Sequence, residues 1–403
     1  MYSRDLIQPL ERYLNTFPAV LLGGSRQVGK TTLVREFLSR KFRYVLLEDP
    51  DLRALAKTDP RTFLERHPPP VIFDEFQNVP ELVSYLQGMI DEHRQTKGMF
   101  ILTGSQNFLM MEQVSQSLAG RIGILTLYGL NSNELPKAAL SNDEKSLGAL
   151  LLRGCYPELW ATTPQIHPAD WYGSYVQTYL EKDIRRLVNV SDLSTFERFL
   201  RVCAAHTGQE LNISNIANDC GASPTTVTRW ISVLEATYLI RTVPPYLTNL
   251  SARIRKTPKF YFMDTGLAAY LMGFRDEISL MNSPQKGALF ETLVVADIIK
   301  KREARGEHFA PYYLQTQSKV GADLVIEDAQ KLTWIEIKSS RTLMPALASN
   351  LVATAKRSKN LQQREQHYVL AMPIKEQQVF TLQGVKINAL PWYDVESVIH
   401  AKP

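Results

Sequence analysis

Short apolar runs separated by polar segments recur through the first third of the chain. They lie at residues 19–22, 44–47, 71–73, 99–102 and 122–127. A short continuous apolar run bounded by turn residues is typical of a strand buried in a sheet. An amphipathic pattern at 4–15 predicts a helix before the first run. Residues 1–140 are therefore expected to form an α/β domain.

The hydrophobic pattern becomes mostly helical from 145 to 272 and mixed again towards the C-terminus. It predicts a long helix at 171–187 and another helix from 286 to 302. Strands are expected after the second helix, at 312–314, 323–326 and 334–338. The domains that we predict from these changes are 1–140, 141–275 and 276–403.

Residues 210–230 of the middle region fit a helix-turn-helix. Gly221 suits the turn, while Ser223 and Pro224 suit the cap and first position of the second helix. The run 238–243 resembles the wing strand of a winged helix. The second helix would present threonines and an arginine outward, where a recognition helix meets DNA. Winged helices also serve in protein contacts, so DNA and a protein partner both stay open.

The first apolar run leads into Gly24-x-x-x-x-Gly29-Lys30-Thr31 and a helix-compatible stretch. This is the phosphate-binding loop pattern in its required context of strand, glycine-rich turn and helix. The glycines let backbone N–H groups point at an anion, and the helix N-terminus adds partial positive charge. Lys30 is expected to reach the β- and γ-phosphates of ATP, and the Thr31 hydroxyl to ligate Mg²⁺. The predicted nucleotide-binding residues are Gly24, Ser25, Gln27, Val28, Gly29, Lys30, Thr31, Thr32, Asp74 and Ser105.

Polar residues follow the third and later apolar runs. Asp74 is expected to hold Mg²⁺ through water, and Glu75 to orient and polarise the attacking water. Ser105 and Gln106 are candidates for sensing the γ-phosphate, with an ordinary polar turn as the alternative. Arg121 is a candidate arginine finger, in cis or on a neighbouring subunit of a homo-oligomer. A surface salt bridge is the other interpretation of Arg121.

A second set of charged residues lies near the C-terminus. Strand alternation places Glu336 and Lys338 on one face, Asp323 leads the previous strand of an expected hairpin, and Glu291 lies on a helix. This is the constellation of the PD-(D/E)XK nucleases. Asp323 and Glu336 would bind Mg²⁺ with Glu291 completing the shell, and Lys338 would act on the attacking water. The alternative for Glu336 and Lys338 is an ion pair on an exposed strand.

The composition restricts the class of protein and its partners but does not indicate a specific function. Hydrophobic residues make up 44% of the 403 residues and charged residues 22%, as in ordinary globular proteins. The net charge of +5 and the basic run 253–259 permit contact with a nucleic-acid backbone but do not demand it. Scattered cysteines give no metal or redox spacing, which favours buried free thiols. With no apolar signal core or membrane-length run, we expect a cytoplasmic protein without a membrane partner.

Several blocks together resemble a prokaryotic family of AAA-type ATPases that carry a C-terminal domain of unknown function. The blocks, in the family's order, are GGSRQVGKTTL, IFDEFQNVPEL, LTGSQ, SLAGR, YLEKDIRRL, KTPKFYFMDTGLAAYL and GALFE…GADLVI…IEIKSS. The resemblance implies a P-loop ATPase core, a winged-helix middle and a restriction-endonuclease-like α/β end. The family's functional residues match at Lys30, Asp74, Glu75, Gly120, Arg121, Glu291, Asp323, Glu336 and Lys338. One departure is Gly321, where many members carry an acid.

The sequence therefore predicts an ATP-binding and ATP-hydrolysing protein, with ATP and Mg²⁺ as cofactors. Its first hypothesis couples the nucleotide state to a DNA-directed, Mg²⁺-dependent nuclease-like domain. Its alternative is a nucleotide-controlled switch that binds DNA or protein and whose nuclease-like fold is inactive.

Overall fold

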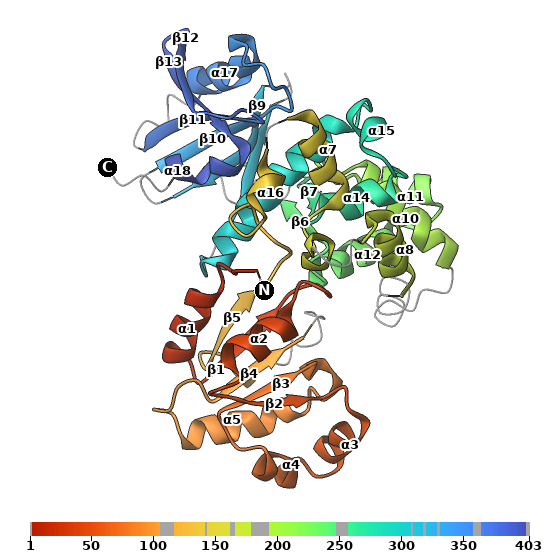
Figure 1. The fold of residues 1–403 in the computed structure, drawn as a ribbon, viewed down its shortest axis with the longest axis vertical. Coiled ribbons are helices and arrows are strands. Elements are labelled where there is room, and N and C mark those ends of the chain that lie inside the picture. Colours follow the sequence, from red (N-terminus) through yellow and green to blue (C-terminus); the bar gives the residue numbers. More distant parts are fainter. Residues whose placement is uncertain are drawn as a thin grey trace. The chain divides into compact units, whose positions relative to one another are not determined.

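The structure is a computed structural model with side chains. It describes residues 2–104, 117–141, 143–161, 166–178, 193–246, 257–307, 309–316, 320–328, 331–357 and 364–399. Two compact units divide the chain, and Figure 1 shows the elements of each. The first unit comprises Met1–Leu130, Ala236–Leu239 and Lys300–Glu307. The second unit comprises Asn131–Glu235, Ile240–Ile299 and His308–Pro403.

A five-stranded sheet forms the centre of the first unit. Its strands are β1 (Ala19–Gly23), β2 (Arg43–Leu46), β3 (Val71–Asp74), β4 (Phe100–Thr103) and β5 (Ile122–Thr126). The order is β2-β3-β4-β1-β5, and the neighbouring strands pair in parallel. Each apolar run predicted as a strand is confirmed to within one residue at either end. The α/β prediction for this part of the chain is confirmed as well.

Helices connect the strands of the first unit. They are α1 (Ile7–Thr16), α2 (Lys30–Leu38), α3 (Pro50–Thr58), α4 (Pro60–Arg66) and α5 (Leu82–Glu92), with a short 3₁₀ turn at Phe76–Asn78. Asp49 begins α3 by accepting hydrogen bonds from the backbone N–H groups of Asp51 and Leu52. The side chains of Phe63, Phe73 and Phe100 pack in one buried core against the sheet. Apolar burial of this kind supplies the main stabilisation of a parallel sheet.

The second unit begins with a helical part. Its elements are α7 (Glu144–Arg153), α8 (Pro168–Tyr175), α10 (Leu193–Ala205), α11 (Ile213–Cys220), α12 (Pro224–Ala236), β6 (Ile240–Val243), β7 (Lys259–Phe262), α14 (Thr265–Leu271) and α15 (Glu277–Met281), with 3₁₀ turns at Lys137–Leu140 and Pro157–Trp160. The predicted helix 171–187 is described only at its start, because residues 179–192 lie outside the described part. Strands β6 and β7 pair as an antiparallel ribbon after α12.

Helices α11 and α12 form the turn that the sequence predicts. Gly221 ends α11 with a left-handed φ of 75°, a conformation that glycine adopts without a Cβ clash. The Ser223 hydroxyl accepts from the Thr226 N–H at 3.1 Å and so caps α12. Val227 and Leu234 are buried, whereas the predicted outward residue Arg229 is exposed. Two helices joined by a short turn are therefore present where the sequence predicts a helix-turn-helix.

A six-stranded mixed sheet closes the second unit. Its elements are α16 (Lys286–Ala304), β8 (Tyr312–Gln315), β9 (Gly321–Glu327), β10 (Lys331–Ile337), α17 (Ser349–Arg357), β11 (Glu365–Met372), β12 (Gln378–Leu382), β13 (Val385–Pro391) and α18 (Glu396–Ile399), with 3₁₀ turns at Pro345–Ala348 and Trp392–Asp394. The strand order is β12-β13-β11-β10-β9-β8. Strands β9 and β10 are antiparallel, which confirms the predicted hairpin, and β10 pairs with β11 in parallel.

Two global expectations can be compared with the described residues. None of their helices combines the length and the apolar character that crossing a bilayer requires. Cys155, Cys203 and Cys220 are buried free thiols, as predicted from their scattered positions.

Candidate functional site

The phosphate-binding loop lies between β1 and α2 in the first unit. Strand β1 is flanked by β4 and β5, so its carboxyl end lies within the sheet and not at an edge strand. Gly24 has a φ of 143°, and a Cβ there would lie 2.0 Å from the Leu127 carbonyl oxygen. Gly29 has a φ of 95° and ends the loop directly before α2. Both glycines therefore hold backbone conformations that other residues rarely adopt.

Lys30 is folded back into this loop. Its ammonium group donates to the carbonyl oxygens of Gly24 and Ser25, each at 2.8 Å. Burial lowers the pKa of Lys30 to about 8, although the carboxylates of Glu75 and Asp74 act in the opposite direction. The ammonium group of Lys30 is thus bound to carbonyl oxygens of the loop, and a bound phosphate would replace these acceptors.

Asp74, at the carboxyl end of β3, joins the second motif to the phosphate-binding loop. Its Oδ2 accepts from the Thr31 hydroxyl at 2.7 Å and from the Tyr44 hydroxyl at 2.5 Å. Its Oδ1 accepts from the Thr103 hydroxyl and from the Glu75 N–H. Both oxygens of the buried carboxylate therefore have protein donors.

The pairing of Thr31 with Asp74 fits a Mg²⁺ ion by its chemistry. A hydroxyl and a carboxylate beside a lysine are the oxygen ligands and charge that Mg²⁺ with nucleotide phosphates requires. Glu75 follows Asp74 with a left-handed φ of 55°, and Gln77 donates to its carboxylate. A strained backbone at a non-glycine residue beside such a site is typical of a functional position.

Two residues of this nucleotide site were not predicted as contacts of Asp74. Thr103 stands in the LTGSQ block directly before the predicted γ-phosphate sensors, so a signal for it existed. Tyr44 lies on β2 and carries no motif signal. Ser105 and Gln106 lie outside the described residues, and their predicted role stays a prediction.

Arg4 also reaches the phosphate-binding loop, and nothing in the sequence pattern indicated it. Its guanidinium donates to the Val28 carbonyl at 2.8 Å and to the Tyr128 carbonyl at 2.5 Å. Arg4 is buried, with 8% of its surface exposed. Because Val28 belongs to the loop and Tyr128 follows β5, Arg4 fixes the loop against the neighbouring strand.

Arg121 is engaged elsewhere in this structure. Its guanidinium makes two hydrogen bonds to Asp91, at 2.9 Å from Nε and 3.1 Å from Nη2. A bidentate pair of this kind holds the side chain in one orientation. The geometry thus supports the salt-bridge interpretation, and the arginine finger stays a prediction.

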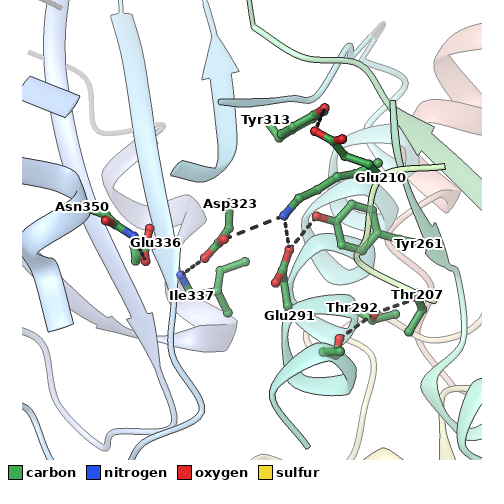
Figure 2. Close-up of polar contacts among 12 residues, drawn as sticks. Thr207, Glu210, Tyr261, Glu291, Thr292, Tyr313, Asp323, Glu336, Ile337 and Asn350 are labelled. Carbon is green, nitrogen blue, oxygen red and sulfur yellow. Dashed lines mark hydrogen bonds and ion pairs between the residues drawn. The ribbon is translucent and has the colours of Figure 1, made fainter. Parts of the chain in front are cut away.

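A second candidate site, the carboxylate cluster, consists of Glu291, Asp323 and Glu336 with Lys338. These carboxylates come from α16, β9 and β10 to one region of the second unit (Figure 2). Lys338 Nζ lies 2.6 Å from Glu336 Oε1, and only 2% of the Glu336 side chain is exposed. The ion pair is therefore not one on an exposed strand. The structure brings together all four residues that the sequence predicted here.

Lys259, on β7, enters the carboxylate cluster from the helical part of the second unit. Its Nζ lies 2.9 Å from Glu291 Oε1 and 3.9 Å from Asp323 Oδ1. The sequence analysis placed Lys259 in a basic run that would permit contact with a nucleic-acid backbone. In the structure, only 12% of the Lys259 side chain is exposed and its charge faces carboxylates. Residues 253–256 of the same run lie outside the described part.

Neutral donors complete the carboxylate cluster (Figure 2). The Tyr261 hydroxyl donates to Glu291 Oε1 at 2.7 Å, and the Ile337 N–H donates to Asp323 Oδ2 at 2.8 Å. Asn350 donates to Glu336 Oε1 at 3.1 Å. Each carboxylate thus has a protein partner that the sequence analysis did not identify.

Burial and mutual repulsion shape the protonation of the carboxylate cluster. Burial and the nearby Asp323 carboxylate raise the pKa of Glu336 to about 7, against the effect of Lys338. Burial and Asp323 also raise the pKa of Glu291. Burial alone would lower the pKa of Lys259, but Glu291 and Asp323 outweigh it and raise that pKa.

The carboxylate cluster, as arranged, does not fit a divalent metal ion. Within the described part of the chain, no three His, Cys, Asp or Glu side chains converge as a metal site. The ammonium group of Lys259 stands beside the two carboxylates that a metal would have to share. The carboxylates predicted as metal ligands are present, but the ammonium group of Lys259 lies beside two of them, Glu291 and Asp323.

Comparison with protein families divides the chain into three matches. Residues 16–135 match a family described as an AAA domain. Residues 144–278 and 286–393 match families described as domains of unknown function, DUF8612 and DUF4143. The N-terminal part of the chain is therefore similar to an AAA domain.

Known relatives add no activity. The uncharacterized protein Rv2008c of Mycobacterium tuberculosis and the uncharacterized protein Mb2031c of Mycobacterium bovis are each 29% identical over 351 residues, covering 86% of this chain and 76% of the relative. Among solved structures, the Walker-type ATPase PABY2304 of Pyrococcus abyssi has a TM-score of 0.46 at 16% identity, over 67% of this chain and 96% of that chain. The RuvB protein of Thermotoga maritima gives 0.30 at 17% identity, over 60% and 89% of the two chains. These likenesses assign no activity or partner to this chain.

Proposed function

We propose that this protein is a nucleotide-controlled switch that binds and hydrolyses ATP in its first unit. The observation that carries this proposal is the 2.7 Å hydrogen bond between Thr31 and Asp74. It joins the phosphate-binding loop to a carboxylate 43 positions later, which is the pairing that a Mg²⁺–ATP site needs. The match to an AAA domain over residues 16–135 supports the same function.

Each residue of the nucleotide site has a role in this proposal. Thr31 and Asp74 would hold Mg²⁺, which neutralises phosphate charge when bound. Lys30 exchanges the carbonyls of Gly24 and Ser25 for phosphate oxygens, and the loop N–H groups bind the same anion. Glu75 orients the attacking water and accepts its proton.

Two paired variants test this assignment. Lys30→Ala should abolish both ATP binding and hydrolysis, because it removes the charge that the phosphates recruit. Glu75→Gln should retain ATP binding but lower kcat by about 10²-fold or more, the usual contribution of a general base. Binding is measured with a fluorescent ATP analogue and hydrolysis by phosphate release. Hydrolysis at the wild-type rate in Glu75→Gln would refute the role of Glu75.

A chain segment next to α12 supports control of the second unit by the nucleotide. The segment Ala236–Leu239 consists of the last residue of α12 and the three residues that follow it, and it belongs to the first unit. Tyr238 in this segment has a left-handed φ of 60°, and its hydroxyl lies where a Cβ at Gly23 would be, within 2.3 Å. Gly23 ends β1 directly before the phosphate-binding loop. A conformational change in the phosphate-binding loop would therefore act on Tyr238, two residues after the C-terminal end of α12.

For the second unit, we propose DNA as the partner, bound through the exposed face of α12 in a winged-helix manner. A protein partner or a second copy of the chain is the alternative for this face. The Mg²⁺-dependent nuclease hypothesis has the four expected residues in one place. Because the cluster does not fit a divalent ion as arranged, the geometry better supports the version of the switch with an inactive nuclease-like fold. The proposed location is the cytoplasm, where ATP is available.

A further inference from the structure

The lysine in the carboxylate cluster is held there by its backbone, not only by its charge. Strand β7 pairs with β6 on one side, where Lys259 lies opposite Val243. On its other side, the segment 208–211 bonds to the backbone of 258–260, including Leu211 N to Pro258 O at 2.8 Å. A residue fixed on both sides in this way projects its side chain in one direction, so Lys259 is a built part of the cluster.

An aromatic ring and several hydroxyl groups lie near the ammonium group of Lys259 and the residues that flank β7. Its ammonium lies 5.6 Å from the centre of the Tyr313 ring, a distance at which a cation is attracted to the ring. The Tyr313 hydroxyl in turn donates to the Thr257 carbonyl at 2.7 Å. Nearby, the Thr207 and Thr292 hydroxyls are hydrogen-bonded at 2.9 Å, next to Glu291 on α16 (Figure 2). These contacts join β8 to the residues just before β7, and the residues just after α10 to α16.

Lysine ammonium groups offset two of the three carboxylate charges in the cluster without a metal. Glu291, Asp323 and Glu336 supply three negative charges when ionised, and Lys259 and Lys338 supply two positive charges. Lys338 contacts Glu336, whereas Lys259 faces both Glu291 and Asp323. A divalent ion bound by that pair of carboxylates would lie against the ammonium group of Lys259 and be repelled by it.

We propose that the ammonium group of Lys259 takes the cation position beside Glu291 and Asp323. A divalent ion then binds this cluster only when a substitution removes the positive charge of Lys259. The cluster is then a latent metal site, closed by a residue of the neighbouring β6–β7 ribbon. This inference rests on the inactive nuclease-like fold of the proposed function and deepens it. It names the residue that makes the fold inactive.

The test is Mn²⁺ titration by calorimetry of the full chain without nucleotide. Wild-type protein should show no Mn²⁺ binding that depends on Asp323. Lys259→Met should gain one Mn²⁺ site that the wild type lacks, because the competing charge is gone. Adding Asp323→Asn to Lys259→Met should remove the gain and so locate the ion.

Matched variants separate this inference from a general effect of charge. Lys338→Met removes one lysine contact to a carboxylate of the same cluster but leaves Lys259 in place, so it should behave like the wild type. Lys259→Gln keeps a long side chain that can donate to Glu291, and it should gain the Mn²⁺ site as well. It provides the test if Lys259→Met folds poorly. Circular dichroism checks the fold of each variant.

Two results would overturn the inference. One is Asp323-dependent Mn²⁺ binding by the wild type that is as tight as in Lys259→Met. The other is the absence of any gain in both folded Lys259 variants. Either result leaves the ATPase proposal standing, because that proposal is tested separately at Lys30 and Glu75.

Discussion

Gly24 carries the strongest steric constraint among the residues of the phosphate-binding loop. Its φ is 143°, and a Cβ added there would approach the Leu127 carbonyl oxygen to 2.0 Å, so both features require glycine. Gly24→Ala should therefore lower the free energy of unfolding of the first unit by at least about 2 kcal/mol and weaken ATP binding. Urea denaturation followed by fluorescence measures the first effect.

Gly29→Ala is the matched control for that prediction. Gly29 also has a left-handed φ, of 95°, but a Cβ there would meet only the Arg4 guanidinium, at 3.8 Å. Its cost should be limited to about 1–2 kcal/mol of backbone strain. Equal destabilisation by the two substitutions would show that the contact with Leu127 is not what requires Gly24.

Another glycine lies at the position that departs from the family pattern. A Cβ at Gly321 would lie 1.8 Å from the Leu314 carbonyl oxygen, where β9 pairs with β8. An acidic side chain at this position, which the resemblance implies, would therefore have no room in this structure.

At the scale of elements, α12 offers the clearest test of the proposed partner. Its buried face is formed by Val227, Trp230 and Leu234, while Arg229 on the opposite face is exposed. If this face binds DNA, affinity should fall steeply with salt, and Arg229→Gln should reduce the slope by about one unit. Fluorescence anisotropy of a labelled duplex at several salt concentrations measures both.

The control for the α12 prediction removes an arginine from the first unit. Arg94 has a side chain that is 73% exposed, so Arg94→Gln changes the net charge equally without touching α12. It should leave the salt slope at its wild-type value. Binding that responds neither to salt nor to Arg229→Gln would point to a protein partner for this face.

For the whole molecule, the central question is whether ATP drives DNA cleavage. The wild-type protein with Mg²⁺ and ATP should not nick plasmid DNA above the background of Asp323→Ala and Lys338→Ala, since the ammonium group of Lys259 lies beside Glu291 and Asp323 and would repel a divalent ion there. Gel electrophoresis of supercoiled plasmid shows nicking directly. Mg²⁺-dependent nicking by the wild type that both substitutions remove would restore the nuclease hypothesis.

The chain divides into two units whose boundaries differ from the three predicted domains. The second unit holds the helix-turn-helix and the carboxylate cluster together, whereas residues Ala236–Leu239 and Lys300–Glu307 return to the first unit. Three domains were predicted from the hydrophobic pattern, and their boundaries stay predictions. The two returning segments could not be foreseen, because short stretches of chain show no pattern that tells which core they join.

Features whose chemistry is local could be predicted from the order of residues alone. The phosphate-binding loop and its lysine lie within eight consecutive residues, Gly24 to Thr31, and the apolar runs predicted every strand of the first sheet. The helix-turn-helix was also visible, because Gly221 and the Ser223 cap act on their immediate neighbours. Even the four residues of the cluster were identified, since each stands in a recognisable block.

Contacts between side chains far apart in the chain became known only from the folded structure. The contact of Thr31 with Asp74, and that of Arg4 with the phosphate-binding loop, depend on strand order and on how distant segments of the first unit pack. In the sequence, Lys259 belongs to a basic run and resembles a surface lysine. In the structure, the pairing of β7 with β6 directs its side chain towards Glu291. Charge in a sequence gives the sign of a side chain, whereas its partner is set by the backbone that aims it.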